Sequence, residues 1–249
     1  MRNWAYILFF VSCFGTAQLT PTKLVKGGEF MPQYGAVKNQ KVKVKDFYMD
    51  VTPVTHRQFL EFLKADPQWT RSNVKRLFAE KEYLSDWDGD LSVPATLEDV
   101  PVVNVSWFAA KAYCNYYHHK RLPTTNEWEY AAMASATKKD ARKDSLFNAE
   151  ILQWYAMKNA RLLKVGVTKA NYWGIKDLNK LVWEWTSDFN SVMMTGDSRN
   201  NKDSNLFCGA GSLSSNDLMD YAAYLRYAMR SSIQANYTLT NLGFRCVKD

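Results

Sequence analysis

Two capping boxes fix where helices begin in this chain. In Thr55–Gln58 and in Thr124–Glu127 a threonine is followed three residues later by Gln or Glu, so that the two side chains satisfy each other's free backbone N–H groups. Apolar residues at helical spacing follow both boxes: Phe59, Phe62 and Leu63 after the first, and Trp128, Ala131 and Ala132 after the second. We therefore expect two amphipathic helices that start at these positions.

The remaining segments predict one mixed α+β domain with little regular secondary structure. Ser106 is placed to cap a third helix that runs to about Tyr117. Alternation predicts a strand from Lys41 to Met49, and Leu242 to Val247 predicts a closing strand. Beyond residue 150 Tyr, Trp, Asn and Gly dominate, and we expect short elements there. A hydrophobic content of 47% over 249 residues excludes a disordered or collagenous chain.

The first residues predict export. Arg2 precedes the apolar run from Trp4 to Phe14, and small residues end at Ala17, which together indicate a secretory signal peptide over residues 1–17 and a domain over 18–249. The alternative is a lipoprotein signal acylated at Cys13. Both place the mature chain in an oxidising compartment, periplasmic or secreted. No later apolar run reaches spanning length, so we expect a protein that does not span the membrane.

The formal charge of +7 does not indicate a nucleic-acid partner, because the basic residues are scattered. Lys41, Lys43 and Lys45 alternate with apolar residues and predict the solvated face of a strand. The three histidines do not indicate a metal site either. We expect His56 on the solvated side of a helix start, and the adjacent His118 and His119 diverge by about 100° on a helix.

Several motifs occur in a characteristic order along the chain: Gly27–Phe30, Phe47–Asp50, Pro101–Trp107, Ala112–Cys114, Arg121–Thr124, Glu127–Ala132, Gly174–Leu178, Val182–Asp188 and Gly243–Cys246. This order and spacing resembles the sulfatase-modifying-factor family, whose founding members are formylglycine-generating enzymes. The resemblance implies a single formylglycine-generating-enzyme-like domain related to C-type lectin-like folds. It also implies a disulfide between Cys114 and Cys246.

The family's reaction centre is not matched. Its founding members bind copper through two cysteines that follow a stretch matched here by Gly209–Ser212, but no cysteine occurs from Gly209 to Arg245. Because Cu(I) prefers sulfur ligands, we expect no copper and no formylglycine-generating activity. We expect no iron either, because the three histidines do not indicate a metal site. Cys208 is interpreted as a buried structural cysteine, with a displaced ligand or reactive thiol as the alternative.

The resemblance also implies a calcium site. Its ligands would be the Asp177 and Glu184 side chains and the backbone carbonyls of Lys180 and Val182, a hard oxygen set. The alternative is a salt-bridged turn in which Lys180 neutralises the carboxylates. Asp86–Asp90 also resembles the start of a calcium loop, but its twelfth position is Leu97, so we expect an acidic turn there.

By position in the family, the former active site would be a binding cleft lined by Trp183, Ser212, Tyr221, Arg226 and Arg230. The aromatic rings would form its walls, and the arginines would either hold a carboxylate or peptide backbone or pair internally.

The leading hypothesis is a pseudoenzyme that binds another periplasmic protein or peptide as an accessory factor. Asp188–Ser191, Leu206–Gly209 and Ser231–Ser232 resemble a subgroup encoded beside copper nitrite reductases, which suggests a copper enzyme as the partner. The alternatives are an oxidoreductase with altered metal chemistry and a lectin-like carbohydrate or surface binder.

Overall fold

The computed structural model describes residues 19–32, 40–117, 119–190 and 218–249, and within them it confirms a mixed domain built from short elements. In chain order these are β1 (Thr22–Val25), β2 (Gly28–Phe30), β3 (Val42–Val44), β4 (Phe47–Asp50), α1 (His56–Ala65), the 3₁₀ helix η1 (Pro67–Trp69), α2 (Trp107–Tyr116), β5 (Lys120–Arg121), α3 (Thr125–Ala132), α4 (Ser145–Ala156), the 3₁₀ helix η2 (Ala160–Leu162), β6 (Trp183–Glu184), α7 (Leu218–Ser232), β7 (Leu242–Gly243) and β8 (Val247–Lys248).

Within the described ranges, the strands form three small sheets. The largest has the order β1-β4-β8-β5 with antiparallel neighbours, β2 pairs antiparallel with β3, and β6 pairs in parallel with β7. The single strand expected from Lys41 to Met49 is therefore wrong, since it divides into β3 and β4 in different sheets. The break falls at Asp46, whose carboxylate accepts the Gly27 N–H at 2.8 Å. The expected closing strand divides in the same way into β7 and β8.

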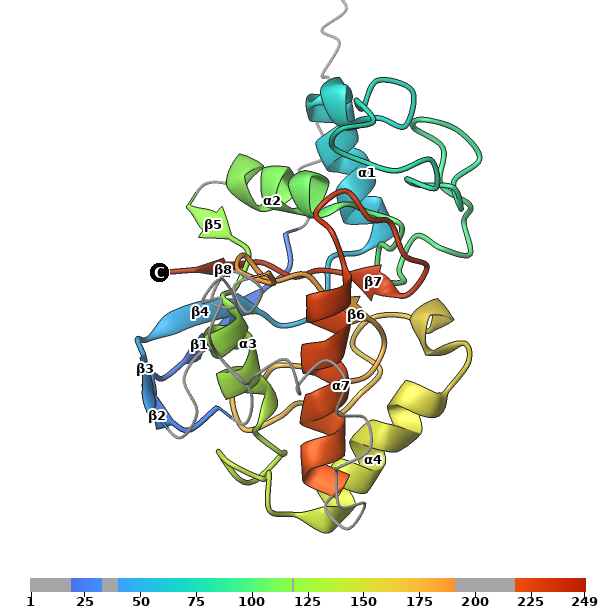
Figure 1. Ribbon diagram of the computed structural model, residues 1–249. Helices are drawn as coiled ribbons and strands as arrows, with labels where there is room; N and C mark the ends of the chain where they lie inside the picture. Colours follow the sequence, from blue (N-terminus) through green and yellow to red (C-terminus); the bar gives the residue numbers. More distant parts are fainter. Residues whose placement is uncertain (1–18, 33–39, 118, 191–217) are drawn as a thin grey trace, which may run out of the picture.

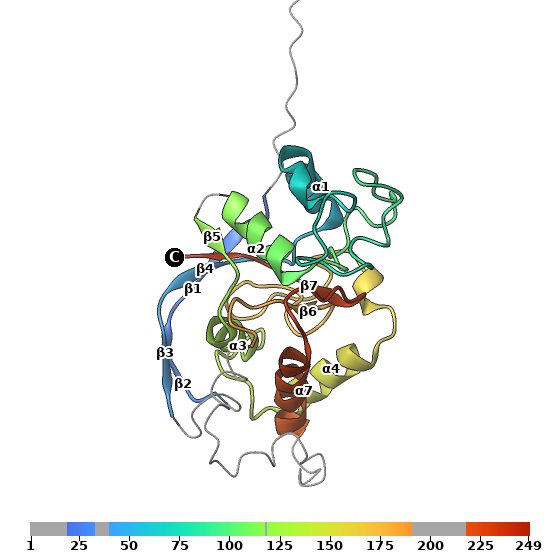
Figure 2. The same ribbon diagram turned by 45° about the horizontal axis from the view of Figure 1, so that its top comes forward.

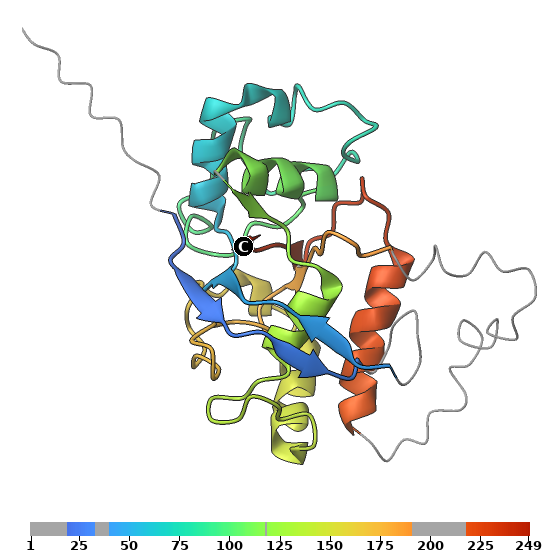
Figure 3. The ribbon, with the colours of Figure 1, turned by 90° about the vertical axis from the view of Figure 1, so that its left-hand side faces the viewer.

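The elements lie in two groups around these strands. Helices α1 and α2 lie together at the top of Figure 1, while α4 and α7 lie beside each other in its lower part. Strands β1 to β4 form a curved band along one side of the molecule, whereas β6 and β7 lie apart from it (Figure 2). Figure 3 views this band face on, with α1 and α2 above it. Helix α3 lies between the band and α7, so it contacts both the strands and the polar site described below.

In the part of the chain that the structure describes, the core consists of two apolar clusters. The first surrounds α1 and α2 and includes Phe59, Tyr113, Trp185 and Phe244. The second packs the strands on α3 and includes Phe47, Met49, Trp128 and Trp173. Each large aromatic ring buries 150–250 Å² of surface, so a few of them compensate for the small extent of regular structure.

Helix α7 is longer than the sequence predicts. It spans 15 residues in a region where we expected only short elements. Its buried face carries the small Ala222 and Ala223 together with Arg226 and Arg230, so it lacks the stripe of large apolar residues by which a helix is recognised. Among the described residues no helix is both long and apolar enough to cross a lipid bilayer.

The disulfide implied by the family resemblance is confirmed. Cys114 in α2 is bonded to Cys246, just before β8, with a Cα–Cα distance of 5.6 Å and a sequence separation of 132 residues. Both cysteines are fully buried, and the bond ties the C-terminal segment to α2.

Candidate functional site

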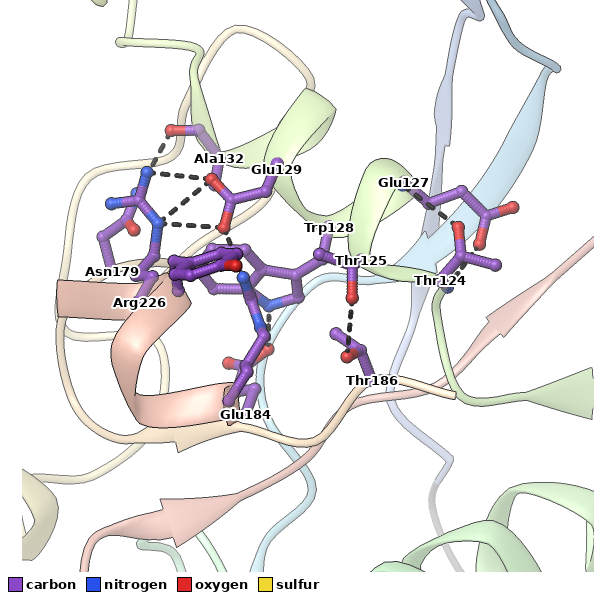
Figure 4. Close-up of polar contacts among 12 residues, drawn as sticks. Thr124, Thr125, Glu127, Trp128, Glu129, Ala132, Asn179, Glu184, Thr186 and Arg226 are labelled. Atoms are coloured by element: carbon purple, nitrogen blue, oxygen red, sulfur yellow. Dashed lines mark hydrogen bonds and ion pairs between the residues drawn. The ribbon is translucent and has the colours of Figure 1, made fainter. Parts of the chain in front are cut away.

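Helix α3 lies at the centre of the polar site (Figure 4). Its capping box is complete, since the Thr124 hydroxyl accepts the Glu127 N–H at 3.2 Å and the Glu127 carboxylate accepts the Thr124 N–H at 2.8 Å. The next residue, Thr125, donates its N–H and its hydroxyl to Asp188, at 2.7 and 2.9 Å. The start of α3 is thereby fixed to the segment that carries β6.

Both arginines of α7 pair with one carboxylate of α3. Arg226 donates to Glu129 from Nε at 3.0 Å and from Nη2 at 2.8 Å, and Arg230 donates to it from Nη1 at 2.6 Å. The two guanidinium carbons lie 5.9 and 4.9 Å from the centre of the Trp128 ring. The sequence left open whether these arginines hold a ligand or pair internally, and in this arrangement they pair internally.

The electrostatics of this cluster keep Glu129 ionised. Burial by itself raises the pKa of its carboxyl, but the adjacent guanidinium groups of Arg226 and Arg230 outweigh burial and lower that pKa to about 2. An acid of this strength is no proton donor near neutral pH. The cluster therefore holds α7 against α3 and leaves an excess positive charge between them.

A cavity of about 270 Å³ lies beside this cluster and includes Trp183. Its aromatic walls come from Trp154, Tyr155 and Trp183, and the Tyr155 and Trp183 rings lie 4.6 Å apart. The Tyr155 hydroxyl accepts a hydrogen bond from Arg226 at 3.3 Å and donates one to Asn179 at 3.2 Å. The buried cluster thus positions one wall of the cavity.

The same cavity is lined by three cationic residues, Lys158, Arg161 and Lys180. Lys180 pairs with Glu150 at 2.6 Å. Within the described residues, the other ion pairs of lysine and arginine involve neither Lys158 nor Arg161. The cavity therefore combines flat aromatic walls with two cations, Lys158 and Arg161, for which the described chain shows no ion pair.

The cleft predicted from the sequence is only partly assembled. Trp183 lines the cavity, whereas Tyr221, Arg226 and Arg230 are not among its lining residues. Tyr221 lies near the start of α7 and is 49% exposed. Ser212 and Cys208 lie outside the described residues.

The residues of the implied calcium site do not fit a calcium ion in this arrangement. The buried Asp177 carboxylate accepts hydrogen bonds from the N–H groups of Gly166 and Thr168 and from the Thr168 hydroxyl. Glu184 accepts hydrogen bonds from Trp128 and from the guanidinium of Arg245. Protein donors thus surround both carboxylates in this arrangement.

The two backbone positions of that set, Lys180 and Val182, line the Trp183 cavity. The alternative salt-bridged turn needs correction as well, because Lys180 pairs with Glu150 and not with Asp177 or Glu184. The charge that compensates Glu184 is that of Arg245.

His56 is buried, which corrects the expectation of a solvated histidine. Its side chain is 1% exposed at the start of α1, and its Nδ1 accepts the Trp87 indole N–H at 2.8 Å. The neutral ring therefore carries its proton on Nε2, which lies 3.7 Å from an Asp86 carboxylate oxygen and has no hydrogen-bond partner there. Burial, assisted by the charge of Arg161, lowers the pKa of His56 to about 4, although the Asp86 charge raises it in part.

We expect His56 to make the stability depend on pH. Between pH 6.5 and about 4 the histidine of the unfolded chain is protonated, whereas the folded one stays neutral. The neutral buried ring therefore contributes fully to the free energy of unfolding above pH 6.5, and this contribution is lost as the pH falls towards 4. The shift corresponds to about 3 kcal/mol. Urea unfolding at a series of pH values should show a shallower loss for His56→Asn, whose amide oxygen still accepts from Trp87.

The exposed His119 supplies the control for this experiment. Its backbone has a φ of 59°, which Asn tolerates, so His119→Asn should retain the wild-type pH profile. If the free energy of unfolding fell equally with pH in the wild type and in His56→Asn, His56 would not be a source of the pH dependence.

Sequence reasoning did not identify Glu129, Tyr155 and Arg161 as site residues. Glu129 belongs to the family motif Glu127–Ala132, but its partners Arg226 and Arg230 lie 97 and 101 residues away in the sequence. Tyr155 and Arg161 lie in the segment that we expected to be irregular. Arg226 and Arg230 lie on the face of α7 that otherwise carries small residues. That pattern could have predicted a buried carboxylate opposite them.

The chain is similar in sequence to known proteins. The model of the sulfatase-modifying factor enzyme 1-like domain matches residues 14–249. The serine/threonine-protein kinase pkn1 of Chlamydia pneumoniae is 28% identical over 183 residues, which cover 69% of this chain and 28% of the kinase. The chain thus spans just over a quarter of the length of the chlamydial kinases that it matches.

Two relatives match along most of their length. The formylglycine-generating enzyme of Streptomyces coelicolor is 29% identical over 267 residues, covering 89% of this chain and 84% of the relative. The inactive C-alpha-formylglycine-generating enzyme 2 of Bos taurus is 27% identical over 247 residues, covering 83% and 78%. The structure of PvdO from Pseudomonas aeruginosa is similar in fold, with a TM-score of 0.51 and 16% identity over 92% of this chain and 94% of that one.

Proposed function

This chain belongs to the sulfatase-modifying factor family, and from that premise we propose that it is an exported accessory factor that binds another periplasmic protein and does not generate formylglycine. Overall identity does not separate the two possibilities, since an active and an inactive relative match at 29% and 27%. The cysteine positions favour the inactive alternative. The absence of any cysteine from Gly209 to Arg245 removes the sulfur ligands that the family's copper requires.

The observation that carries the proposal is the Trp183 cavity. Its walls of Trp154, Tyr155 and Trp183 suit an apolar or planar group, and Lys158 and Arg161 supply positive charge for a carboxylate. Arg226 and Arg230 would not contact the ligand, because Glu129 already binds them. Arg226 supports the wall through its hydrogen bond to the Tyr155 hydroxyl, which favours a site preorganised for binding.

We propose a copper enzyme of the nitrite reductase type as the first partner to test. The support is the resemblance of Asp188–Ser191, Leu206–Gly209 and Ser231–Ser232 to the subgroup encoded beside such enzymes. A binding factor for such an enzyme needs no metal of its own.

The test joins one binding and one activity measurement. Purified mature chain should bind purified copper nitrite reductase in biolayer interferometry, and Lys158→Glu should weaken the complex at least tenfold. Lys81→Glu is the matched charge reversal, at an exposed lysine that does not line the cavity. A cysteine peptide of the sulfatase type incubated with the protein and copper should retain its thiol, as read by mass spectrometry.

Three results would contradict the proposal. Conversion of the cysteine peptide to the aldehyde would restore the family's reaction. Stoichiometric copper or iron in the purified protein would favour the oxidoreductase alternative. Retention on a glycan array without binding to any periplasmic protein would favour the lectin-like alternative.

A further inference from the structure

A second cavity, of about 440 Å³, lies between α2 and the segment that follows α1. Helix α2 contributes Phe108, Lys111, Ala112 and Asn115, whose spacing places them on one face of the helix. The opposite wall comes from η1 and the chain after it: Gln68, Trp69, Asn73, Val74, Lys75 and Phe78. None of these residues lines the Trp183 cavity, so the two sites are separate.

Aromatic rings give this groove its apolar surface. The Phe78 ring lies 5.2 Å from that of Phe108 and 6.1 Å from that of Trp69, and all three side chains are only half-buried. Leu77, beside Phe78, is 75% exposed. An open groove lined by half-buried rings, with an exposed leucine next to it in the chain, favours a polypeptide over a small ligand enclosed in the cavity.

The charges of the groove are of one sign. Lys75 and Lys111 are exposed, and no acidic residue is among the lining residues. The Lys111 ammonium lies 4.8 Å from the centre of the Trp107 ring, which draws it over the α2 face. In the described parts of the chain, the lysines that form ion pairs are Lys26, Lys64, Lys120, Lys138, Lys164 and Lys180. Neither groove lysine is therefore neutralised by a described carboxylate.

Carboxamides occupy the remaining polar positions. The Asn73 amide donates to the Pro67 carbonyl at 3.0 Å and the Gln68 amide donates to Asp66 at 3.0 Å, which turns both side chains towards their own backbone segment. Their oxygens and the Asn115 amide supply neutral hydrogen-bonding groups of the kind that bind a peptide backbone.

We infer that this groove binds an acidic segment of a partner polypeptide. One apolar side chain of that segment packs against Phe78 and Phe108, and a flanking carboxylate pairs with Lys75 or Lys111. Aromatic anchoring with charge complementarity at the rim is the pattern of specific peptide recognition. The inference goes beyond the proposed function, since it concerns a different surface and does not depend on the Trp183 cavity.

The test uses a fluorescein-labelled peptide with a central Phe flanked by Asp and Glu, read by fluorescence polarisation against the mature chain. The probe should bind, and binding should weaken as NaCl is raised. A matched peptide with Lys in place of each acid, and one with Ala in place of Phe, should each bind at least tenfold more weakly.

Protein variants locate the binding. The double variant Lys75→Glu/Lys111→Glu changes two exposed residues and should keep the wild-type circular dichroism while binding the acidic probe at least tenfold more weakly. Phe108→Leu should weaken the probe without changing the salt dependence. Lys158→Glu, at the other cavity, should bind the probe like the wild type, so failure here is distinguishable from failure of the proposed function.

Two results would overturn the inference. In the first, the acidic and lysine-containing peptides bind equally, or the double variant binds like the wild type. In the second, an acidic polysaccharide such as polygalacturonate occupies the groove with Lys75 and Lys111 dependence while the acidic peptide does not.

Discussion

Substitution of Glu184 by Gln is expected to lower the free energy of unfolding by about 3–5 kcal/mol. The Glu184 and Arg245 side chains are 1% and 0% exposed, and the guanidinium donates to the carboxylate from Nε and Nη2, each at 2.8 Å. The Trp128 indole donates to the same carboxylate at 2.8 Å. Gln removes the charge that compensates Arg245 and turns an amide NH₂ or a weaker acceptor towards these donors. An uncompensated charge then remains in the core.

The measurement is urea unfolding monitored by tryptophan fluorescence, with Glu61→Gln as the control. Glu61 pairs with Lys64 at the surface, where such a pair contributes about 0–1 kcal/mol. The double variant Glu184→Gln/Arg245→Met should recover part of the loss, because it removes the unpaired charge. It should not recover all of it, since Arg245 also donates to the carbonyls of Asp50, Val51 and Lys176.

Repeating the series in EDTA and in calcium separates the ion pair from the metal site implied by the family resemblance. The arrangement around Glu184 predicts the same loss for Glu184→Gln in both solutions. A loss that appears only in calcium would show that Glu184 binds the ion in solution, and the fit of Arg245 to this carboxylate would then be wrong.

The starts of the helices could be predicted because their determinants are local. The capping boxes at Thr55 and Thr124 and the Ser106 cap are all present, at the N-termini of α1, α3 and α2. In each case the hydroxyl binds an N–H three residues ahead, so four residues contain all the interacting groups. The disulfide followed from the family resemblance and not from any local pattern.

The charged site could not be predicted because its partners are distant in the sequence. Glu184 and Arg245 are 61 residues apart, and Glu129 lies 97 residues before Arg226. The burial of His56 likewise depends on Trp87, 31 residues later. The family motifs predicted the carboxylate oxygens of Glu184 and Asp177 as calcium ligands. Only the surrounding N–H groups show that these oxygens accept hydrogen bonds in this arrangement.

Removal of the Cys114–Cys246 disulfide is the second change with a large expected effect. The chain-entropy estimate for a closed loop of this size is about 4–5 kcal/mol, and measured losses for native disulfides run from about 2 to 5 kcal/mol. The bond joins residues 132 positions apart, so its loss mainly enlarges the unfolded ensemble. Cys114→Ala/Cys246→Ala should therefore unfold at a lower urea concentration while its near-UV circular dichroism without urea stays close to wild type.

Both proteins should be compared in a Cys208→Ser background, because the third thiol of the predicted mature chain would otherwise offer exchange partners during unfolding. Dithiothreitol is the internal control: it should lower the stability of the disulfide-bonded protein towards that of the double Ala variant and leave the variant unchanged. Equal urea midpoints for the two proteins would contradict the expected stabilisation. A loss of native near-UV signal in the variant would instead place the effect in the folded state, where both sulfurs pack in the cluster around α1 and α2.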